Sequence, residues 1–397
     1  MKILYIHNRY QYRGGEDIIL EQEVAMLRRH GHTVNVLLFD NEDFTSGSLP
    51  TKILSGFKTF YNADSARRVE KAIDTFTPDI IHIHNLFYTA SPAVIHVAKQ
   101  RRIPVVMTMH NYRLVCASGS LMRVNEIPCE RCLTQTFPLD GIRFGCFRNS
   151  HLQTAQLTAI TGLHKQIGTW RSLDRLIVLT DFIRQKIVNS SLRLSPEQVI
   201  VKPNAIADLG YDVSYTREHT LLYVGRLTIE KGIRVLLEAA RLYSFPLEII
   251  GDGPLRNEVQ AAADTMSNVR YSGLLDREVV IERIRQCQAL IVPSIWYEGL
   301  PTVIIEAFST GTPVICSDQP NFRTIVEENK NGIFFTMGDA DALANVIRQL
   351  KTNDLMAIGK AGRVSYQDQY TEQIVYKQHV AIYESLLAQL PLIKVGS

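Results

Sequence analysis

The sequence predicts an α/β protein of two doubly wound domains. Short β-branched runs alternate with amphipathic helical patterns along the whole chain of 397 residues. Such alternation is typical of βαβ units, which build parallel sheets. The apolar runs are continuous, as expected for strands that are buried on both faces of a sheet. A chain of this length is too long for one ordinary hydrophobic core, so two domains are expected.

The first half contains six strand-like runs separated by helical patterns. The runs are KILYIHN, TVNVLLF, DIIHIHN, IPVVMTMHN, RLIVLT and VIVKPNA. Helical periodicity is clear at 17–29, 66–76 and 181–189. We therefore expect a Rossmann-like domain over residues 1–203, with an insertion at about 113–150 between the fourth run and the next long helix.

The second half repeats this order of elements. Its runs are TLLYVGR, LEIIGDG, VRYSG, ALIVPS, TPVICSD and GIFFTM, each followed by a helical pattern. The hinge is expected near Pro203 and Asn204, where a polar loop follows the last run of the first half. The second domain is expected over 204–370. The final helix, within 371–397, has no strand after it, and we expect it to pack back on the first domain.

Composition and charge narrow the function classes. With 46% apolar and 21% charged residues, the chain is typical of globular proteins. It has no apolar run long enough to span a membrane and no secretory cleavage site, so a cytoplasmic location is expected. Residues 1–203 hold 25 Lys and Arg against 17 Asp and Glu, net +8, which fits an anionic acceptor or peripheral contact with a membrane. The lack of a basic recognition helix argues against nucleic-acid binding.

Two glutamates surround the start of one predicted helix. Ligands of doubly wound sheets bind at the carboxyl ends of the strands. Glu298 lies in the loop after ALIVPS, and Glu306 lies eight positions later in the helix that Pro301 opens. The backbone N–H groups of this helix start attract an anion. Two carboxylates for hydroxyl groups and N–H groups for a phosphate match the parts of a nucleotide sugar. The alternative is that both glutamates are surface residues.

Two other predicted strand ends carry cations or glycines. Arg226 and Lys231 surround a tight turn after TLLYV, and they would neutralise a diphosphate leaving group without a metal. Gly251 and Gly253 follow LEII, and they would let a flat ligand such as a base approach the backbone.

The first domain offers a histidine and a pair of glycines at its strand ends. His110 ends the run PVVMTM, where a functional role is favoured over simple packing. Gly14 and Gly15 would bring backbone N–H groups to a phosphate, but RGGED is not the G-x-G-x-x-G of a dinucleotide dehydrogenase. His82 and His84 alternate along DIIHIHN and are expected to serve packing or loop hydrogen bonds.

The insertion contains a cluster of four cysteines, Cys116, Cys129, Cys132 and Cys146. Their spacing is C-x12-C-x2-C-x13-C, and PCERC is a turn of the kind that binds zinc. A structural zinc held by all four is the favoured interpretation, with free thiols as the alternative. Cys287 and Cys316 are expected in the core. Asp339 and Asp341 form a D-x-D sequence, for which a helix N-cap is favoured over a metal site.

Taken together, these segments resemble the retaining glycosyltransferases of family 4, which have the GT-B fold of two Rossmann-like domains facing a cleft. The resemblance covers nearly the whole chain and rests on GGE, HNYRLVC, VGRLTIEKG, GDGP and the E-x7-E pattern, in that order. It implies transfer of a hexose from a UDP-sugar, with glucose the best guess, to a saccharide or lipid-linked acceptor in polysaccharide synthesis. It also implies that configuration is retained and that no catalytic metal is needed.

The resemblance assigns roles to matching residues. Arg226 and Lys231 would hold the donor diphosphate, Glu306 the ribose and Glu298 the transferred sugar, while His110 would lie beside the reacting carbon and the 6-hydroxyl. The catalytic set is His110, Glu298, Arg226 and Lys231. The donor-binding set is Gly14, Gly15, Arg226, Lys231, Gly251, Gly253, Gly273, Leu274, Glu298, Gly299, Leu300, Pro301, Thr302 and Glu306.

Other functions stay open on the sequence alone. A non-hydrolysing sugar-nucleotide epimerase would act on the nucleotide sugar itself and would need no acceptor. A non-catalytic nucleotide-sugar sensor, or a zinc-organised interaction protein, would bind without turnover. The presence together of the catalytic set and Glu306 argues against lost catalysis.

Overall fold

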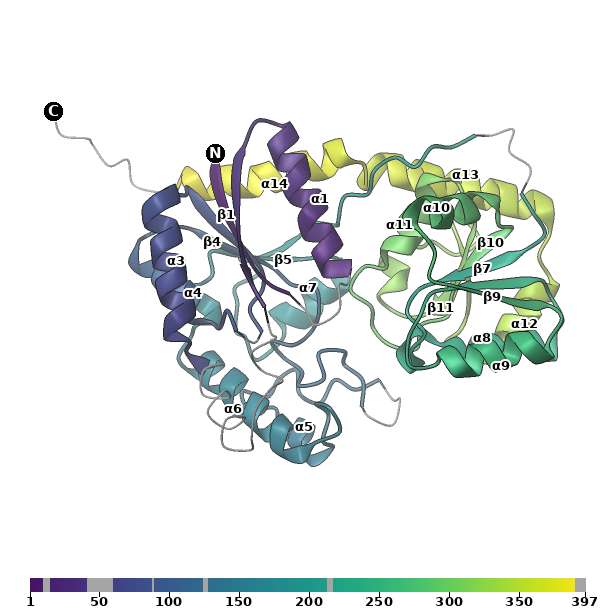
Figure 1. Ribbon diagram of the computed structural model, residues 1–397, viewed down its shortest axis with the longest axis horizontal. Coiled ribbons are helices and arrows are strands. Elements are labelled where there is room, and N and C mark those ends of the chain that lie inside the picture. The colour runs from purple at the N-terminus through teal and green to yellow at the C-terminus, as the bar shows by residue number, and fades with distance from the viewer. Residues whose placement is uncertain (10–14, 41–59, 88, 124–127, 213–216, 390–397) are drawn as a thin grey trace. The chain divides into compact units, whose positions relative to one another are not determined.

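The structure is a computed structural model, and it describes residues 1–9, 15–40, 60–87, 89–123, 128–212 and 217–389. The chain divides into two compact units. The first unit comprises Met1–Ser120, Cys129–Ala205 and Val375–Ser397, and the second comprises Leu121–Pro128 and Ile206–Ile374. Each unit contains one parallel sheet (Figure 1).

The sheet of the first unit has six strands in the order β2-β1-β3-β4-β5-β6, and every neighbouring pair is parallel. The strands β2 and β3 lie on opposite sides of β1. The order in which the chain adds strands to the sheet therefore reverses between β1 and β3. The loops after β1 and β3 therefore flank the topological switch point, where ligands of such sheets bind. The strands are β1 (Lys2–Asn8), β2 (Thr33–Phe39), β3 (Ile80–Asn85), β4 (Val105–Thr108), β5 (Arg175–Val178) and β6 (Val199–Val201).

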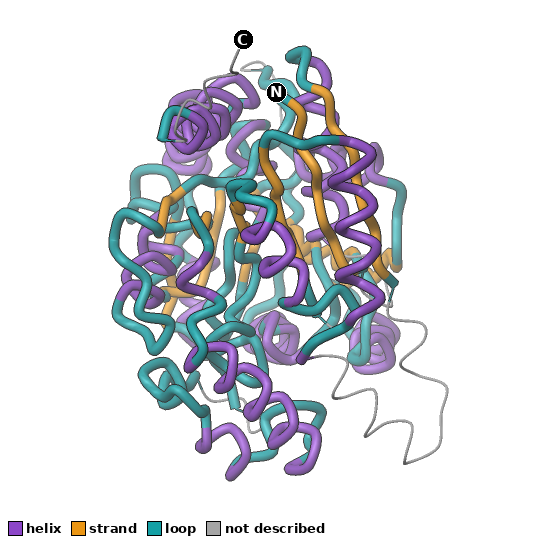
Figure 2. Tube along the Cα trace, turned by 90° about the vertical axis from the view of Figure 1, so that its left-hand side faces the viewer, coloured by secondary structure: helices purple, strands orange, loops and turns teal. Residues whose placement is uncertain are grey.

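Helices line this first sheet, as Figure 2 shows with helices in purple and strands in orange. One core joins both ends of the chain, because Leu20 and Leu27 of α1 and Ile382 and Tyr383 of α14 pack with Tyr5 of β1. Figure 1 shows α14, in yellow, running beside β1. The helices are α1 (Gly15–Arg29), α3 (Ala63–Phe76), α4 (Ala93–Gln100), α5 (Leu139–Arg143), α6 (His151–Gln166), α7 (Asp181–Val188) and α14 (Glu372–Leu387).

The sheet of the second unit has the order β12-β11-β10-β7-β8-β9, again all parallel. Here β7 and β10 are neighbours, so the loops that follow these two strands flank the switch point. The strands are β7 (Leu221–Val224), β8 (Leu247–Ile250), β9 (Val269–Gly273), β10 (Ala289–Val292), β11 (Val314–Asp318) and β12 (Ile333–Thr336).

Amphipathic helices cover the second sheet. Leu236 of α8, Val259 of α9 and Leu343 of α12 contribute to one buried cluster with β7 and β8. The side chain of Asp339 accepts a hydrogen bond from the backbone N–H of Ala342, so the D-x-D sequence is the N-cap that we predicted. The helices are α8 (Ile233–Leu242), α9 (Arg256–Thr265), α10 (Arg277–Gln286), α11 (Thr302–Ser309), α12 (Ala340–Arg348) and α13 (Thr352–Gln369).

The predicted fold class of two doubly wound domains is confirmed. Each of the twelve strand-like runs contains an observed strand. One boundary differs slightly, because α11 begins at Thr302 and Pro301 takes the N-cap position. Across the ranges that the structure describes, every helix is either too short or too polar to cross a lipid bilayer.

Candidate functional site

A lysine and a glutamate meet at the switch point of the second unit. The turn after β7 places Lys231 at the end of a short 3-10 helix, Ile229–Lys231. The loop after β10 carries Glu298. Because β7 and β10 are parallel neighbours, both loops leave the same edge of the sheet. The Nζ of Lys231 lies 2.7 Å from the Oε2 of Glu298, which joins two residues that are 67 positions apart in sequence.

Three residues that the sequence analysis did not select surround this pair. The Oγ of Ser294 donates to the second carboxylate oxygen of Glu298. The Nδ2 of Asn321 donates to the backbone oxygen of Glu298 and, at 2.9 Å, to that of Gly299. The Trp296 ring lies 5.8 Å from Lys231 Nζ. Glu298 is only 5% exposed, so it is not a surface loop residue.

The glycines of these loops are needed where backbone segments touch. Gly232 ends the turn with φ of 74°, and a Cβ there would lie 1.8 Å from the carbonyl oxygen of Pro293. A Cβ on Gly251 would lie 1.9 Å from the carbonyl oxygen of Gly225. The close approach of the β7 loop is therefore enough to require glycine at position 251, without any contact to a ligand. The predicted contact between a base and Gly251 or Gly253 stays a prediction.

Glu306 has a cationic partner that the sequence did not reveal. It lies on α11 and is 7% exposed, and its Oε1 is 3.1 Å from Nη1 of Arg277. Arg277 begins α10, directly after the short loop that follows the last residue of β9, Gly273. The feature of the sequence that could have pointed to Arg277 is its position shortly after the end of a predicted strand. Leu274 is 75% exposed.

Arg226 lies on the exposed side of the β7 turn. Its side chain is 71% exposed, and its Nη2 is 3.9 Å from Oε1 of Glu230. The amide-bearing segment 300–302 leads into α11, whose N-cap residue Pro301 makes no side-chain capping bond. Free N–H groups at such a helix start favour an anion.

The first unit brings His110 to the end of β3. Its Nε2 lies 3.1 Å from Nδ1 of His84, the last histidine of β3. Burial, reinforced by the neighbouring His84, holds the pKa of His110 well below its ordinary value, so the imidazole is neutral. Gly15 begins α1, with open space around the position of a Cβ. Gly14 lies outside the described residues.

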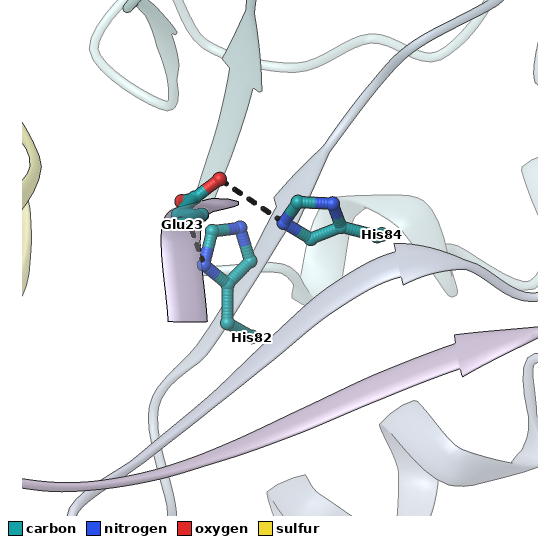
Figure 3. Close-up of side chains that lie close together, drawn as sticks. All are labelled: Glu23, His82 and His84. Atoms are coloured by element: carbon teal, nitrogen blue, oxygen red, sulfur yellow. Dashed lines mark ion pairs between the residues drawn. The ribbon is translucent and has the colours of Figure 1, made fainter. Parts of the chain in front are cut away.

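The cysteines of the insertion lie close enough to affect one another. Burial, assisted by the neighbouring Cys116, Cys146 and Cys129, raises the pKa of the Cys132 thiol to about 12. The four do not form a tight ligand cluster. Among the described residues, the group of metal-ligand types whose donor atoms lie within 4.8 Å of one another is instead Glu23, His82 and His84 (Figure 3). Cys287 and Cys316 are buried in the second unit, as predicted.

Family comparisons cover most of the chain. Residues 13–208 match the model described as "Glycosyltransferase Family 4", and residues 212–365 match "Glycosyl transferases group 1". The boundary between the two matches falls near the predicted hinge.

Curated relatives agree with these matches. The phosphatidyl-myo-inositol mannosyltransferase of Mycolicibacterium smegmatis is 25% identical over 94% of this chain and 90% of its own length. The amylovoran biosynthesis glycosyltransferase AmsK of Erwinia amylovora is 29% identical over 42% of this chain. The match spans only 44% of AmsK, less than half of that relative.

Solved structures share the fold over nearly the full length. Anabaena Alr3699/HepE, solved in complex with UDP, has a TM-score of 0.68 at 16% identity and covers 97% of this chain. Sucrose-phosphate synthase from Thermosynechococcus elongatus has a TM-score of 0.70 at 19% identity and covers 98% of this chain. Both chains are covered in full. The chain belongs to the glycosyltransferases of the GT-B fold, with a family 4 domain followed by a group 1 domain.

Proposed function

We propose that the chain transfers a hexose, namely glucose, from a UDP-sugar to a saccharide or lipid-linked acceptor, retaining the anomeric configuration. The observation that carries this proposal is the pairing of Lys231 with Glu298, and of Arg277 with Glu306, at the strand-end loops of the second unit. UDP and UDP-glucose are the ligands of Anabaena Alr3699/HepE, one structural neighbour. The relatives named above include a mannosyltransferase and an enzyme of amylovoran biosynthesis, which supports a role in glycolipid or polysaccharide synthesis.

In this proposal the ion pairs prepare the donor site. Lys231, Arg226 and Arg277 offer positive charge to the diphosphate, and the amides at the start of α11 offer N–H groups. When the donor diphosphate binds Lys231, it replaces Glu298 as the partner of this lysine. The carboxylate of Glu298 then accepts hydrogen bonds from the transferred sugar. Glu306 accepts hydrogen bonds from the ribose hydroxyls. Enzymes of this group need no catalytic metal, because fixed cations stabilise the leaving group.

The reaction exchanges two bonds at one carbon. The bond from the anomeric carbon to the phosphate oxygen breaks, and a bond to the acceptor oxygen forms on the same face through an oxocarbenium-like state. The departing phosphate takes the acceptor proton. The protein's contributions are positioning and stabilisation of the departing charge, so a strong protein base is not needed. His110, held neutral, serves as a hydrogen-bonding group for the transferred sugar.

The acceptor is proposed from charge. The excess of 25 Lys and Arg over 17 Asp and Glu in residues 1–203 favours an anionic acceptor, such as a lipid-linked phosphate. Work on such an acceptor at the inner face of a membrane would agree with a cytoplasmic protein that makes peripheral contact with lipid.

Calorimetric titration of UDP tests the donor site. Lys231→Met should raise the Kd for UDP about tenfold to a hundredfold, because a charge-assisted hydrogen bond contributes about 1.5 to 3 kcal/mol. Lys330→Met is the matched control, because Lys330 also pairs with a glutamate in the second unit, at 2.9 Å, but on the exposed surface. Equal Kd values for wild type and Lys231→Met would contradict the proposed site.

A further inference from the structure

We infer that the exposed face of α6, in the first unit, binds the surface of a bilayer that contains anionic lipids. An apolar stripe of the helix enters the region between the headgroups, and arginines at both ends of the stripe contact lipid phosphates. The inference rests on the proposed function only for its purpose, which is to bring the enzyme to a lipid-linked acceptor. The binding itself can be measured with vesicles, without donor or acceptor.

The exposed face of α6 is apolar, although a surface helix ordinarily directs its polar residues to water. Leu152 is 74% exposed, Leu163 is 41% exposed, and Ile167, the residue after the helix, is 57% exposed. Together with the exposed Ala159 they recur at intervals of seven, four and four residues, so they follow one side of the helix. These four residues form the apolar stripe. It extends about 22 Å along the axis, at about 1.5 Å per residue.

The opposite face of α6 is buried and largely polar. The Nζ of Lys165 donates to the carbonyl oxygen of Gln135 at 3.1 Å. The Nε2 of His164 lies 3.0 Å from the carbonyl oxygen of Phe60. The first unit therefore holds the helix through its polar side, which leaves the apolar stripe directed outward. The buried polar residues of α6 are Thr154, Thr158, Thr161, His164 and Lys165.

The segment around the stripe carries positive charge only. Residues 141–173 include four Lys and Arg residues but no Asp or Glu. Lys165 is buried, whereas Arg143, Arg148 and Arg171 are exposed. Within the described part of the chain, none of these three arginines forms an ion pair with a carboxylate. Arg148 precedes the stripe by four residues and Arg171 follows it by four, so each end of the stripe offers a cation to an anionic headgroup.

A further exposed apolar side chain lies on the neighbouring helix. Leu139, the first residue of α5, is 62% exposed. The helices α5 and α6 pack together, and Figure 1 shows them side by side. Single exposed apolar residues are ordinary on protein surfaces, but several that gather on adjoining elements indicate a binding surface.

The combination of apolar side chains and unpaired cations favours a bilayer as the partner. At a membrane interface, leucine and isoleucine enter the acyl boundary, while arginine reaches the phosphate level. A second copy of the chain is a poorer partner. Two copies joined symmetrically through this face would bring the same arginines together, and like charges repel.

Co-sedimentation with vesicles tests the surface. The protein is mixed with vesicles of phosphatidylcholine, or of equal parts phosphatidylcholine and phosphatidylglycerol. It should bind the anionic vesicles more strongly, and added salt should weaken this binding because salt screens the charges. The double variant Leu152→Gln and Leu163→Gln should lower the partition coefficient about tenfold to a hundredfold, since it removes two side chains that the bilayer buries.

Two further double variants complete the test. Leu242→Gln with Met356→Gln is the matched control, because these apolar residues are 46% and 62% exposed but lie in the second unit. It should bind vesicles as the wild type does. Arg148→Gln with Arg171→Gln should weaken binding to anionic vesicles about thirtyfold, or about fivefold for each arginine, and should leave binding to neutral vesicles unchanged. Thermal unfolding followed by circular dichroism checks that each variant folds.

The possible outcomes separate this inference from the proposed function. Equal binding to both kinds of vesicle, or wild-type binding by the Leu152→Gln and Leu163→Gln variant, would overturn the inference. A dimer that this variant dissociates in analytical ultracentrifugation, without any vesicle binding, would assign the stripe to a second copy. Vesicle binding by a protein that turns over no nucleotide sugar would contradict only the proposed function. Turnover with a water-soluble acceptor but no vesicle binding would contradict only this inference.

Discussion

Glu298 makes contacts through both its side chain and its backbone. In the structure it pairs with Lys231 at 2.7 Å, and its backbone oxygen accepts a hydrogen bond from Asn321. In the proposed function, this carboxylate accepts hydrogen bonds from the hydroxyls of the donor sugar, and Lys231 is the counter-ion of the donor diphosphate. Neutralising Glu298 should remove the first function and leave the second.

Glu298→Gln should lose most turnover while it still binds UDP. The amide keeps the size of the side chain but weakens hydrogen bonds to sugar hydroxyls that matter in the transition state. Turnover and the Kd for UDP are measured on the same preparation. Glu238→Gln, a substitution at an exposed residue of α8, serves as the control. Near-normal turnover of Glu298→Gln would show that Glu298 is not in the site.

Arg277→Met should weaken UDP binding about tenfold, because Glu306 would lose the cation 3.1 Å away that holds its carboxylate. Arg234→Met is the matched control, because Arg234 forms an exposed pair with Glu258 at 2.9 Å. Fluorescence or calorimetric titration with UDP measures the Kd of both variants. A Kd for Arg277→Met that equals the control value would exclude Arg277 from the site.

At the residue scale, the charged residues of the candidate site could be predicted from the sequence, but the residues that they contact could not. The E-x7-E spacing and the cations of the β7 turn were readable because strand ends mark binding loops. Arg277, Ser294 and Asn321 were not selected, because their contacts depend on which strands become neighbours. Asn321 follows β11, and nothing near it in sequence indicates that its side chain holds the backbone of Glu298 and Gly299.

Among the elements, the cysteine-rich insertion is the least explained by the fold. We propose that its four cysteines hold a structural zinc. Cys132 lies close enough to the other three for them to affect its pKa, and Lys165 on α6, whose pKa burial lowers to about 8, lies near Cys132 and Cys116. Zinc binding would draw the four thiolates together at one ion.

Elemental analysis of protein purified without metal-affinity steps should find stoichiometric zinc. Cys132→Ser should lose the zinc and unfold at lower temperature, because metal binding at such a site contributes folding free energy. Cys316→Ser is the control, since Cys316 lies in the buried core of the second unit. Metal-free wild-type protein that keeps its stability would remove the proposal.

Through His379 on α14, the stability of the first unit is expected to depend on pH. Burial lowers the pKa of His379 to about 3, although Glu23 acts in the opposite direction. The unfolded chain binds a proton at this histidine near pH 6.5, and the folded chain does so only near pH 3. The free energy of unfolding should therefore fall as the pH falls from about 6.5 toward 3. Buried His82 and His110 act in the same direction.

Urea unfolding at several pH values between 7.5 and 5 tests this dependence, and His379→Phe should show a weaker one. His219→Phe is a suitable control, because His219 lies outside the buried network and pairs with Gln288 in an exposed position. Equal wild-type stability at both ends of the range would contradict the expected sign.

On the scale of the whole molecule, the alternation of strands and helices was enough to predict both sheets. Runs such as TVNVLLF and ALIVPS are local signals, and the observed strands coincide with them. The order of strands in each sheet was not readable, because it depends on contacts between distant segments. The core shared by α14 and β1 is of this kind, since Tyr383 and Tyr5 are 378 positions apart.

The central claim is transfer from a nucleotide sugar without a metal, and one assay tests it most directly. The purified protein is incubated with a panel of UDP- and GDP-sugars, with and without EDTA, and release of free UDP or GDP is followed. We predict release from a UDP-hexose, namely UDP-glucose, at a rate that EDTA does not change. Release that EDTA abolishes, or tight UDP binding with no release from any donor even when saccharide and lipid-linked acceptors are supplied, would contradict it.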